Sequence, residues 1–207
     1  MSPVVHEETI SLPAIEFSTT AKRLDLSQCD TLMFTSKKAV ETADEIDASW
    51  KNFPSIAIGS ATKKRIEALG GNVIYSPADF YAKVLSQDIV KFFNEKRILY
   101  LRPEKISFDA KSFLLKEGIE LQEQVIYRTS CIHHNMKNQP TKGSIIIFTS
   151  PSTIACFLKN FQWSKSYIAI VIGESTKEHL PQGAKYEVAD IPLIASCVKK
   201  AKEIAKL

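Results

Sequence analysis

The stretch TLMFTSKKAVETADEI, residues 31–46, decides the fold because it has a close counterpart in SIIIFTSPSTIACFLKN, residues 144–160. In each stretch a short apolar run leads into Phe-Thr-Ser, and the apolar residues then take up helical spacing. This change of period is typical of a buried strand followed by an amphipathic helix. The chain therefore carries the same strand-to-helix signal twice.

Two further pairs of segments repeat in the same order. Phe34 matches Phe148 at an offset of 114 residues, and IAIGSATKKRIEALG (56–70) matches IVIGESTKEHLPQG (170–183) at the same offset. YSPAD, from Tyr75, matches YEVAD, from Tyr186, at an offset of 111. Three ordered matches at nearly one offset indicate two related halves.

Each half alternates short strands, rich in β-branched residues, with amphipathic helices. The predicted strands are 32–34, 55–59, 72–75, 144–148, 168–173 and 185–188, and the predicted helices are 36–46, 60–70, 79–96, 150–161, 174–180 and 191–206. Residues at predicted N-caps are Ser36, Ser60, Asp79, Ser150 and Asp190, and Gly70 with Gly71 ends the second helix. This alternation predicts an α/β fold in which each domain is a parallel sheet flanked by helices, as in flavodoxin-like proteins.

The order of elements also predicts a discontinuous domain. The first half continues with a strand (97–105), a helix (108–118) and an extended segment (119–133), whereas the second half ends at its third helix. Its missing elements must then come from the N-terminus, where MSPVVHEETI is interpreted as the remaining part of a permuted unit. We expect one domain from residues 1–15 plus 130–207 and an inserted domain at 18–124. Two linker strands, 13–18 and 124–130, would join them beside a ligand cleft.

Composition excludes several classes of protein. The chain has 207 residues, 44% of them hydrophobic and 24% charged, and no apolar run approaches the ~20 residues of a membrane span. No signal peptide is visible, and the four scattered cysteines predict buried or idle thiols in a reducing cytoplasm. A net charge of +4 suits a small anionic ligand, and no basic run with interleaved aromatics indicates a nucleic-acid surface.

Common catalytic and cofactor motifs are missing from the sequence. There is no phosphate-binding or dinucleotide-binding glycine loop, no G-x-S-x-G motif, and only seven glycines in all. His133 and His134 are adjacent but lack partner ligands at metal-binding spacings, and His6 and His179 are isolated. The carboxylates form no acid–base pair. We therefore expect no metal site and no bound cofactor.

Small hydroxyl residues mark four matched strand ends. In open α/β sheets ligands bind at this edge, where helix N-termini favour anions. Each residue has the alternative explanation of a simple N-cap. Two other candidates lie near the predicted crossings: Tyr127, which has the alternative of an aromatic packed at a domain junction, and Arg102, which has the alternative of a surface residue. The hydroxyl residues are Thr35, Ser36, Ser60, Thr62, Thr149, Ser150, Ser175 and Thr176.

The segments LPAIEF, DTLMFTSKKAVE, IAIGSATKKRIEALG, ILYLRPE, VIYRT, IIFTSPSTIACF and IVIGESTKEHL together resemble uroporphyrinogen-III synthase, from Leu12 to the C-terminus. No single motif is specific, but their order and spacing are. The resemblance implies a cofactor-free cytoplasmic lyase of haem (tetrapyrrole) biosynthesis. Such an enzyme closes hydroxymethylbilane, a polycarboxylate, to uroporphyrinogen III by way of an azafulvene and a spiro intermediate. Ring D is inverted and water is lost.

The resemblance also implies roles for single residues. Tyr127 matches the family's proposed proton donor, Thr62 and Thr176 match its G-x-x-T threonines, and Ser36 and Ser150 match its F-T-S serines. We assign the hydroxyl residues and Arg102 to substrate binding. Nothing in the sequence requires more than a monomer, and transient contacts with neighbouring pathway enzymes are a further expectation. A non-enzymatic two-domain cytosolic binder of a small anion fits the same repeat, and nucleic-acid binding has only net charge in its favour.

Overall fold

The computed structural model describes residues 9–77 and 81–205. The chain divides into two compact units, with the divisions after Glu16 and after Thr129. We call residues 17–129 the inserted unit and the remaining described residues the discontinuous unit. The domain and linker bounds predicted from the sequence remain a prediction.

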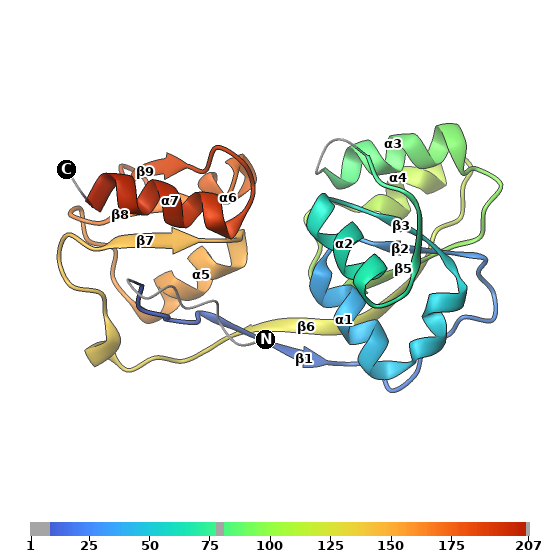
Figure 1. The fold of residues 1–207 in the computed structure, drawn as a ribbon, viewed down its shortest axis with the longest axis horizontal. Coiled ribbons are helices and arrows are strands. Elements are labelled where there is room, and N and C mark those ends of the chain that lie inside the picture. Colours follow the sequence, from blue (N-terminus) through green and yellow to red (C-terminus); the bar gives the residue numbers. More distant parts are fainter. Residues whose placement is uncertain (1–8, 78–80, 206–207) are drawn as a thin grey trace. The chain divides into compact units, whose positions relative to one another are not determined.

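The inserted unit contains a sheet of order β1-β6-β5-β2-β3-β4 (Figure 1). Neighbouring strands from β6 to β4 are parallel. Strand β1 is antiparallel to β6, since Thr20 N–H donates to Ile126 O and Ile132 N–H donates to Ala14 O. The strands are β1 (Ile15–Thr19), β2 (Thr31–Phe34), β3 (Pro54–Ala57), β4 (Asn72–Tyr75), β5 (Ile98–Pro103) and β6 (Gln122–Cys131).

Helices cover both faces of this sheet. Because successive residues of a strand point to opposite faces, each strand contributes side chains to two cores. Leu32 and Phe34 of β2 lie in a core with α1 (Lys37–Ile46) and α2 (Ser60–Ala68), which we call the α1–α2 core. Met33, between them, lies in the opposite core with α3 (Ala82–Phe92) and α4 (Ala110–Lys116), the α3–α4 core. A 3₁₀ turn, η1 (Ala48–Asn52), adds Trp50 to the α1–α2 core. The predicted sheet with two covered faces is confirmed, but it is mixed, because β1 joins the parallel strands in the antiparallel direction.

The discontinuous unit repeats this plan on a smaller scale. Its described strands β7 (Ile145–Phe148), β8 (Ile168–Val171) and β9 (Lys185–Val188) are parallel. Helix α5 (Pro151–Asn160) packs on one face and α7 (Ile194–Ala205) on the other (Figure 1), while α6 (Glu174–Lys177) and the 3₁₀ turn η2 (Met136–Asn138) are short. Most of the segment MSPVVHEETI, interpreted above as the remaining part of a permuted unit, falls in residues 1–8, outside the described residues.

The predicted helix caps are partly confirmed. Ser36 caps α1 and Ser150 caps α5, the latter in a capping box with Thr153. The cap predicted at Ser60 is wrong, because α2 already begins there and the N-cap is Gly59, whose φ of 80° favours glycine. Asp190 is also wrong as a cap. It lies four residues before α7, where it pairs with Lys200 at 2.8 Å. Asp79 lies outside the described residues.

The glycines after α2 behave differently from one another. Gly70 has a φ of 89°, so the predicted left-handed cap is confirmed at this residue. Gly71 has an ordinary φ, and a Cβ there would lie only 2.5 Å from the ring of Trp50. Gly71 is therefore required for close packing against Trp50.

Two of the four cysteines correct the prediction of idle thiols. Cys131, at the end of β6, forms a disulfide with Cys156 of α5, and their Cα atoms lie 5.1 Å apart. The spacing of 25 residues between them gave no signal, because only the packing of α5 beside the end of β6 brings the sulfurs together. The Asn160 side chain supports this contact by donating to Ile132 O and Cys156 O. Cys29 and Cys197 are free and buried, as expected.

Thiol titration checks the cysteine pairing. Protein unfolded in denaturant without reductant should show two reactive thiols, those of Cys29 and Cys197, and four after reduction. In the native protein both thiols should react slowly, because burial restricts access and raises their pKa. Four thiols before reduction would contradict the disulfide.

Candidate functional site

A β-bulge places Tyr127 where the site forms. Strands β5 and β6 run in register until Arg102 pairs with Val125, but Pro103 then pairs with Tyr127, so Ile126 is an extra residue. Such bulges re-aim side chains, and they recur near active sites. Ile126 and Tyr127 consequently both pack in the α1–α2 core, although they are adjacent in the strand. The bulge turns Tyr127 toward the start of α1.

There the Tyr127 hydroxyl lies 3.0 Å from Ser36 Oγ. The same serine oxygen accepts the Ala39 N–H at 3.1 Å, which is the N-cap bond of α1. Phe17 of β1 packs its ring at 5.9 Å, edge to face, on the Tyr127 ring. Tyr127 is only 4% exposed. The Ser36 oxygen thus caps the start of α1 and also orients the buried Tyr127 phenol.

Two opposing effects set the acidity of Tyr127. Burial raises the pKa of the phenol, because the charged phenolate is poorly solvated there, while the hydrogen bond with Ser36 lowers it. The raised pKa keeps the proton on Tyr127 at neutral pH. When Ser36 donates, its bond stabilises the phenolate that forms if that proton leaves. The positive end of α1 acts in the same direction. Tyr127 therefore has the properties of a proton donor.

A second tyrosine, Tyr100 of β5, binds the neighbouring residue of the same turn. Its hydroxyl lies 2.8 Å from Thr35 Oγ1, and burial raises the pKa of Tyr100 to about 12, although the Thr35 hydrogen bond acts to lower it. Sequence reasoning missed this residue because the run ILYL resembles any buried strand. The only available signal was a polar hydroxyl inside that run, two residues before Arg102.

Arg102 is engaged within the inserted unit. Its Nε lies 3.2 Å from Glu123 Oε2, both side chains are largely buried, and Nη1 donates to Pro103 O and Glu104 O. The Nε contact is an ion pair without hydrogen-bond geometry, since neither Arg102 Nε nor Glu123 Oε1 has a hydrogen-bond partner among the described residues. Sequence reasoning missed Glu123. The substrate-binding role of Arg102 remains a prediction.

The start of α2 supplies the other predicted residues of this unit. Thr62 is 4% exposed and its N–H donates to Gly59 O at 3.1 Å, whereas Ser60 is exposed in the first turn. Neither α1 nor α2 carries an acidic residue in its first turn. Their N-terminal positive ends are therefore not neutralised by acidic residues of their own first turns.

The matched residues of the discontinuous unit are arranged more simply. Ser150 caps α5 and contacts Ser152 Oγ at 2.9 Å, Thr149 and Ser175 are exposed, and Thr176 is buried. No tyrosine hydroxyl bonds Thr149 or Ser150 within the described part of the chain. The two halves thus share helix caps, but the structure brings tyrosines to the caps of the inserted unit alone.

The histidines have structural roles in the described chain. His134 Nε2 lies 2.7 Å from Pro13 O, and its ring stacks on Phe161. His133 is exposed, His179 Nδ1 contacts Ser175 O, and His6 lies outside the described residues. Residues 9–77 and 81–205 contain no group of three or more His, Cys, Asp or Glu side chains able to hold a metal ion.

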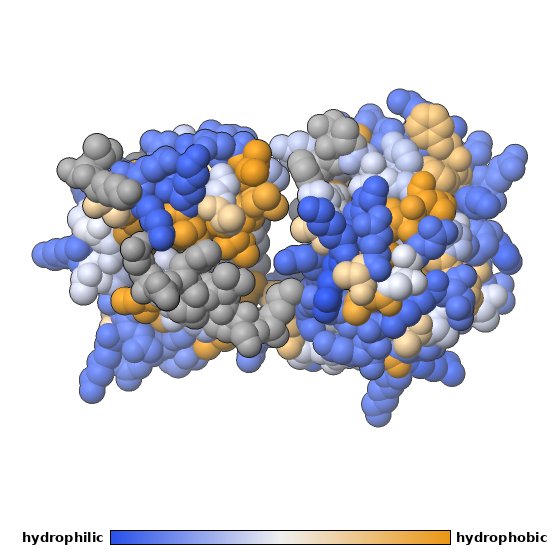
Figure 2. All heavy atoms as spheres, in the orientation of Figure 1, coloured by the Kyte–Doolittle hydropathy of each residue, from blue (hydrophilic) through white to orange (hydrophobic). Residues whose placement is uncertain are grey.

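Two shallow pockets, of about 260 and 370 Å³, lie at the opposite edge of the sheet, at the starts of β5 and β6. Leu99, Arg97 and Gln122 are among their lining residues, and no predicted site residue is. The residues around Tyr127 lie at the carboxyl ends of the strands, where Thr35 and Ser36 are half-buried and Tyr127 is buried. Figure 2 shows that the surface over α1 and α2 is largely hydrophilic.

Two α/β units, in which helices begin at the carboxyl ends of parallel strands, define the class of this protein as two-unit α/β. The sequence matches a family model described as uroporphyrinogen-III synthase HemD over residues 6–198. The chain therefore belongs to the uroporphyrinogen-III synthase family, and the predicted resemblance and fold class are confirmed. None of the helices in the described residues is long and apolar enough to cross a membrane.

Solved structures agree with this assignment. The uroporphyrinogen-III synthetase of Helicobacter pylori 26695 is 27% identical, with 96% of each chain covered and a TM-score of 0.76. A mutant uroporphyrinogen III synthase of Thermus thermophilus is 12% identical, covering 94% of this chain and 88% of that one, with a TM-score of 0.61, and it shows the fold alone. Comparison with curated proteins gives no significant match.

Family membership also gives the reaction. The protein is a lyase of porphyrin (haem) biosynthesis that cyclises hydroxymethylbilane, with inversion of ring D and loss of water. The predicted activity is confirmed at this level.

Replacing Ser36 tests the shared oxygen atom. Ser36→Ala should lose about 1 kcal/mol of stability with the N-cap. The kcat of this variant should also fall, by about 10- to 150-fold. The reason is that the lost hydrogen bond to the Tyr127 phenolate, a charged group, contributes about 1.5–3 kcal/mol. Steady-state kinetics and thermal unfolding measure the two effects.

Asp47→Ala is the matched control, because Asp47 caps η1 through the Ser49 N–H and contacts no site residue. It should lose comparable stability and keep wild-type turnover. Equal kinetics in the two variants would show that Ser36 acts as a cap and nothing more.

Proposed function

We propose that Tyr127 donates the proton that releases water from hydroxymethylbilane, and that the hydroxyl-bearing strand ends bind the carboxylates of the substrate. The observation that carries the proposal is the bond between Ser36 Oγ and the buried Tyr127 hydroxyl. A general acid must hold its proton at neutral pH and must also be stabilised after giving it up. Burial meets the first requirement, and Ser36 with the α1 N-terminus meets the second.

Proton transfer and bond cleavage are coupled in the proposed step. The Tyr127 O–H protonates the hydroxyl of the hydroxymethyl group, the C–O bond breaks, and water leaves. The electron pair comes from the attached pyrrole, which becomes an azafulvenium ion and then gives up its N–H proton to form the neutral azafulvene. A proton returned to the phenolate restores Tyr127. The methylene carbon is then open to attack by the terminal pyrrole, ring D, in the inverting closure.

Carboxylate binding is assigned to both units. In the inserted unit we propose the first turns of α1 and α2, and in the discontinuous unit the starts of α5 and α6. Free N–H groups at helix N-termini and short hydroxyl side chains are suited to carboxylates. The residues proposed are Thr35, Ser36, Ser60, Thr62, Thr149, Ser150, Ser175 and Thr176.

Arg102 is proposed to bind a carboxylate through Nη2 alone. Its Nε faces Glu123, and its Nη1 is used by two backbone carbonyls. Glu123 compensates part of the charge, which limits the affinity that Arg102 adds. Its main effect is to fix one N–H direction beside β5.

Binding geometry matters more than acid strength for the product. The bilane cyclises unaided to the uninverted type I isomer, so the enzyme must hold one conformation of a flexible chain. Orientation of this kind contributes up to about 7–11 kcal/mol in favourable reactions. Several weak, directional contacts are well suited to this task, because they fix a long substrate at many points.

We also propose that the protein acts in the cytoplasm on this small molecule and binds no nucleic acid, with transient contacts to neighbouring pathway enzymes. The net charge of +4, without a basic and aromatic run, supports a small polyanionic ligand.

A coupled assay with hydroxymethylbilane tests the proposal. The wild-type protein should produce the type III isomer above the spontaneous type I background. Tyr127→Phe should lower kcat about 10²- to 10⁴-fold, the usual contribution of a general acid, with KM nearly unchanged. Because burial raises the Tyr127 pKa, its titration should not reduce the wild-type rate below about pH 10.

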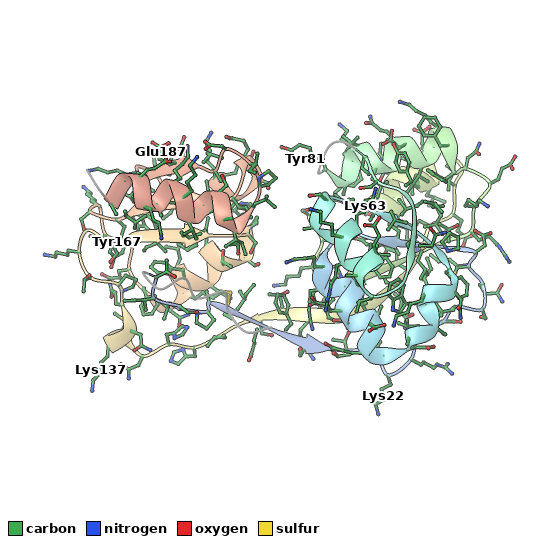
Figure 3. All side chains as sticks on the ribbon, viewed as in Figure 1. Lys22, Lys63, Tyr81, Lys137, Tyr167 and Glu187 are labelled. Carbon is green, nitrogen blue, oxygen red and sulfur yellow. A yellow bond between two sulfur atoms is a disulfide. The ribbon has the colours of Figure 1, made fainter. Side chains whose placement is uncertain are left out.

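Tyr167→Phe is the control, since Tyr167 is a buried tyrosine of the discontinuous unit whose hydroxyl donates to Pro140 O (Figure 3). It should keep wild-type kcat. Full activity of Tyr127→Phe would remove Tyr127 as the donor, and an unchanged isomer ratio with wild-type protein would refute the activity itself.

A further inference from the structure

The turn after β2 is held from both faces of the sheet by tyrosine hydroxyls. Tyr127 packs in the α1–α2 core and bonds Ser36, whereas Tyr100 packs in the α3–α4 core and bonds Thr35. Strand β5 lies beside β2, with Tyr100 in register with Met33, so its ring extends along β2 to the turn. Two consecutive residues thus each contact one buried phenol.

The hydroxyl of Tyr100 is not needed for packing. Its ring contributes to an apolar core where a phenylalanine would fill the same space. A buried hydroxyl loses its hydration, and one hydrogen bond only compensates for that loss. In the described residues, Thr35 Oγ1 is the partner found for the Tyr100 hydroxyl. Packing therefore leaves this hydroxyl unexplained.

The burial of the two groups assigns the donor. Tyr100 is 4% exposed, so its proton must go to Thr35 or stay unsatisfied. Thr35 is only half-buried, and when its oxygen accepts from Tyr100 its own O–H is free to point to the edge of the sheet. Tyr100 thereby converts Thr35 into an oriented donor.

The hydrogen bond at Thr35 also restricts the backbone that leads to Ser36. Ser36 follows directly in extended conformation (φ −156°, ψ 151°), which an N-cap requires. Fixing the Thr35 side chain limits rotation of this link and hence the place of Ser36 Oγ against the Tyr127 hydroxyl.

We propose that Tyr100 is a positioning residue of the cyclisation: through Thr35 it orients the hydroxyl groups of the Thr35–Ser36 turn, which hold the substrate and the proton donor in the geometry that inverts ring D. The part that concerns the donor rests on the role proposed for Tyr127. The part that concerns Thr35 rests on the substrate binding proposed for Thr35 and does not depend on Tyr127.

The isomer ratio of the product is a readout that a merely structural residue would not change. If Thr35 loses its orientation, the activated bilane is held less firmly and part of it closes without inversion. Tyr100→Phe should then lower kcat about 3- to 10-fold, the range of one hydrogen bond, and raise the share of type I product. Tyr167→Phe, which also removes a buried tyrosine hydrogen bond, should keep the wild-type ratio and kcat.

Variants of Thr35 decide the case if Tyr100→Phe does not fold. Thr35→Ser keeps the acceptor and should retain the wild-type isomer ratio, whereas Thr35→Val should raise the type I share. The double variant Tyr100→Phe with Thr35→Val should have the same kcat and the same type I share as Thr35→Val alone. Both substitutions remove the same hydrogen bond, so their effects should not add.

Two outcomes would overturn the proposal: a wild-type kcat and isomer ratio in Tyr100→Phe, or equal ratios in Thr35→Ser and Thr35→Val. A failure of the role proposed for Tyr127 can be distinguished from a failure of the role proposed for Tyr100. In that case Tyr127→Phe stays active while Tyr100→Phe still raises type I product, and the positioning role at Thr35 stands.

Discussion

The hydrogen-bond capacity of one atom, Ser36 Oγ, links the fold to the chemistry. This oxygen accepts the N–H of Ala39 to begin α1, and it contacts the Tyr127 hydroxyl at 3.0 Å. A serine oxygen has two lone pairs and one proton, so it can accept from the helix and still donate to Tyr127. The start of a helix and the orientation of the Tyr127 hydroxyl, the proposed proton donor, therefore depend on the same side chain.

A second constraint comes from the irregular pairing of β5 with β6. The extra residue Ile126 in β6 brings Tyr127 to the α1 side, while β5 leaves Tyr100 on the other face. Arg102 and Glu123 pair beside this irregular segment. A largely buried ion pair contributes little net stability, because desolvation offsets the attraction, so its value lies in fixing directions.

The two halves show how a repeat acquires different roles. Both keep a serine cap after the Phe-Thr-Ser strand end, where the serine oxygen accepts one of the free N–H groups of the first helical turn. Among the described residues, tyrosines reach this cap only in the inserted unit. The capped strand ends are therefore the feature that the two halves share, and the tyrosine contacts are the feature that distinguishes the inserted unit.

Local sequence patterns were enough to predict the repeat, the α/β class and the caps at Ser36 and Ser150, since these depend on periodicity and on bonds spanning three residues. The place of Tyr127 near a predicted crossing made it a candidate, and the resemblance added the prediction that it donates a proton. Tertiary packing was needed for the Cys131–Cys156 disulfide, the Tyr100–Thr35 bond, the Glu123 partner of Arg102 and the cap at Gly59. The first three join residues from different elements, and the cap depends on where α2 begins. Register and bulges are set by packing, because no local pattern of side chains encodes which residue of a neighbouring element lies opposite.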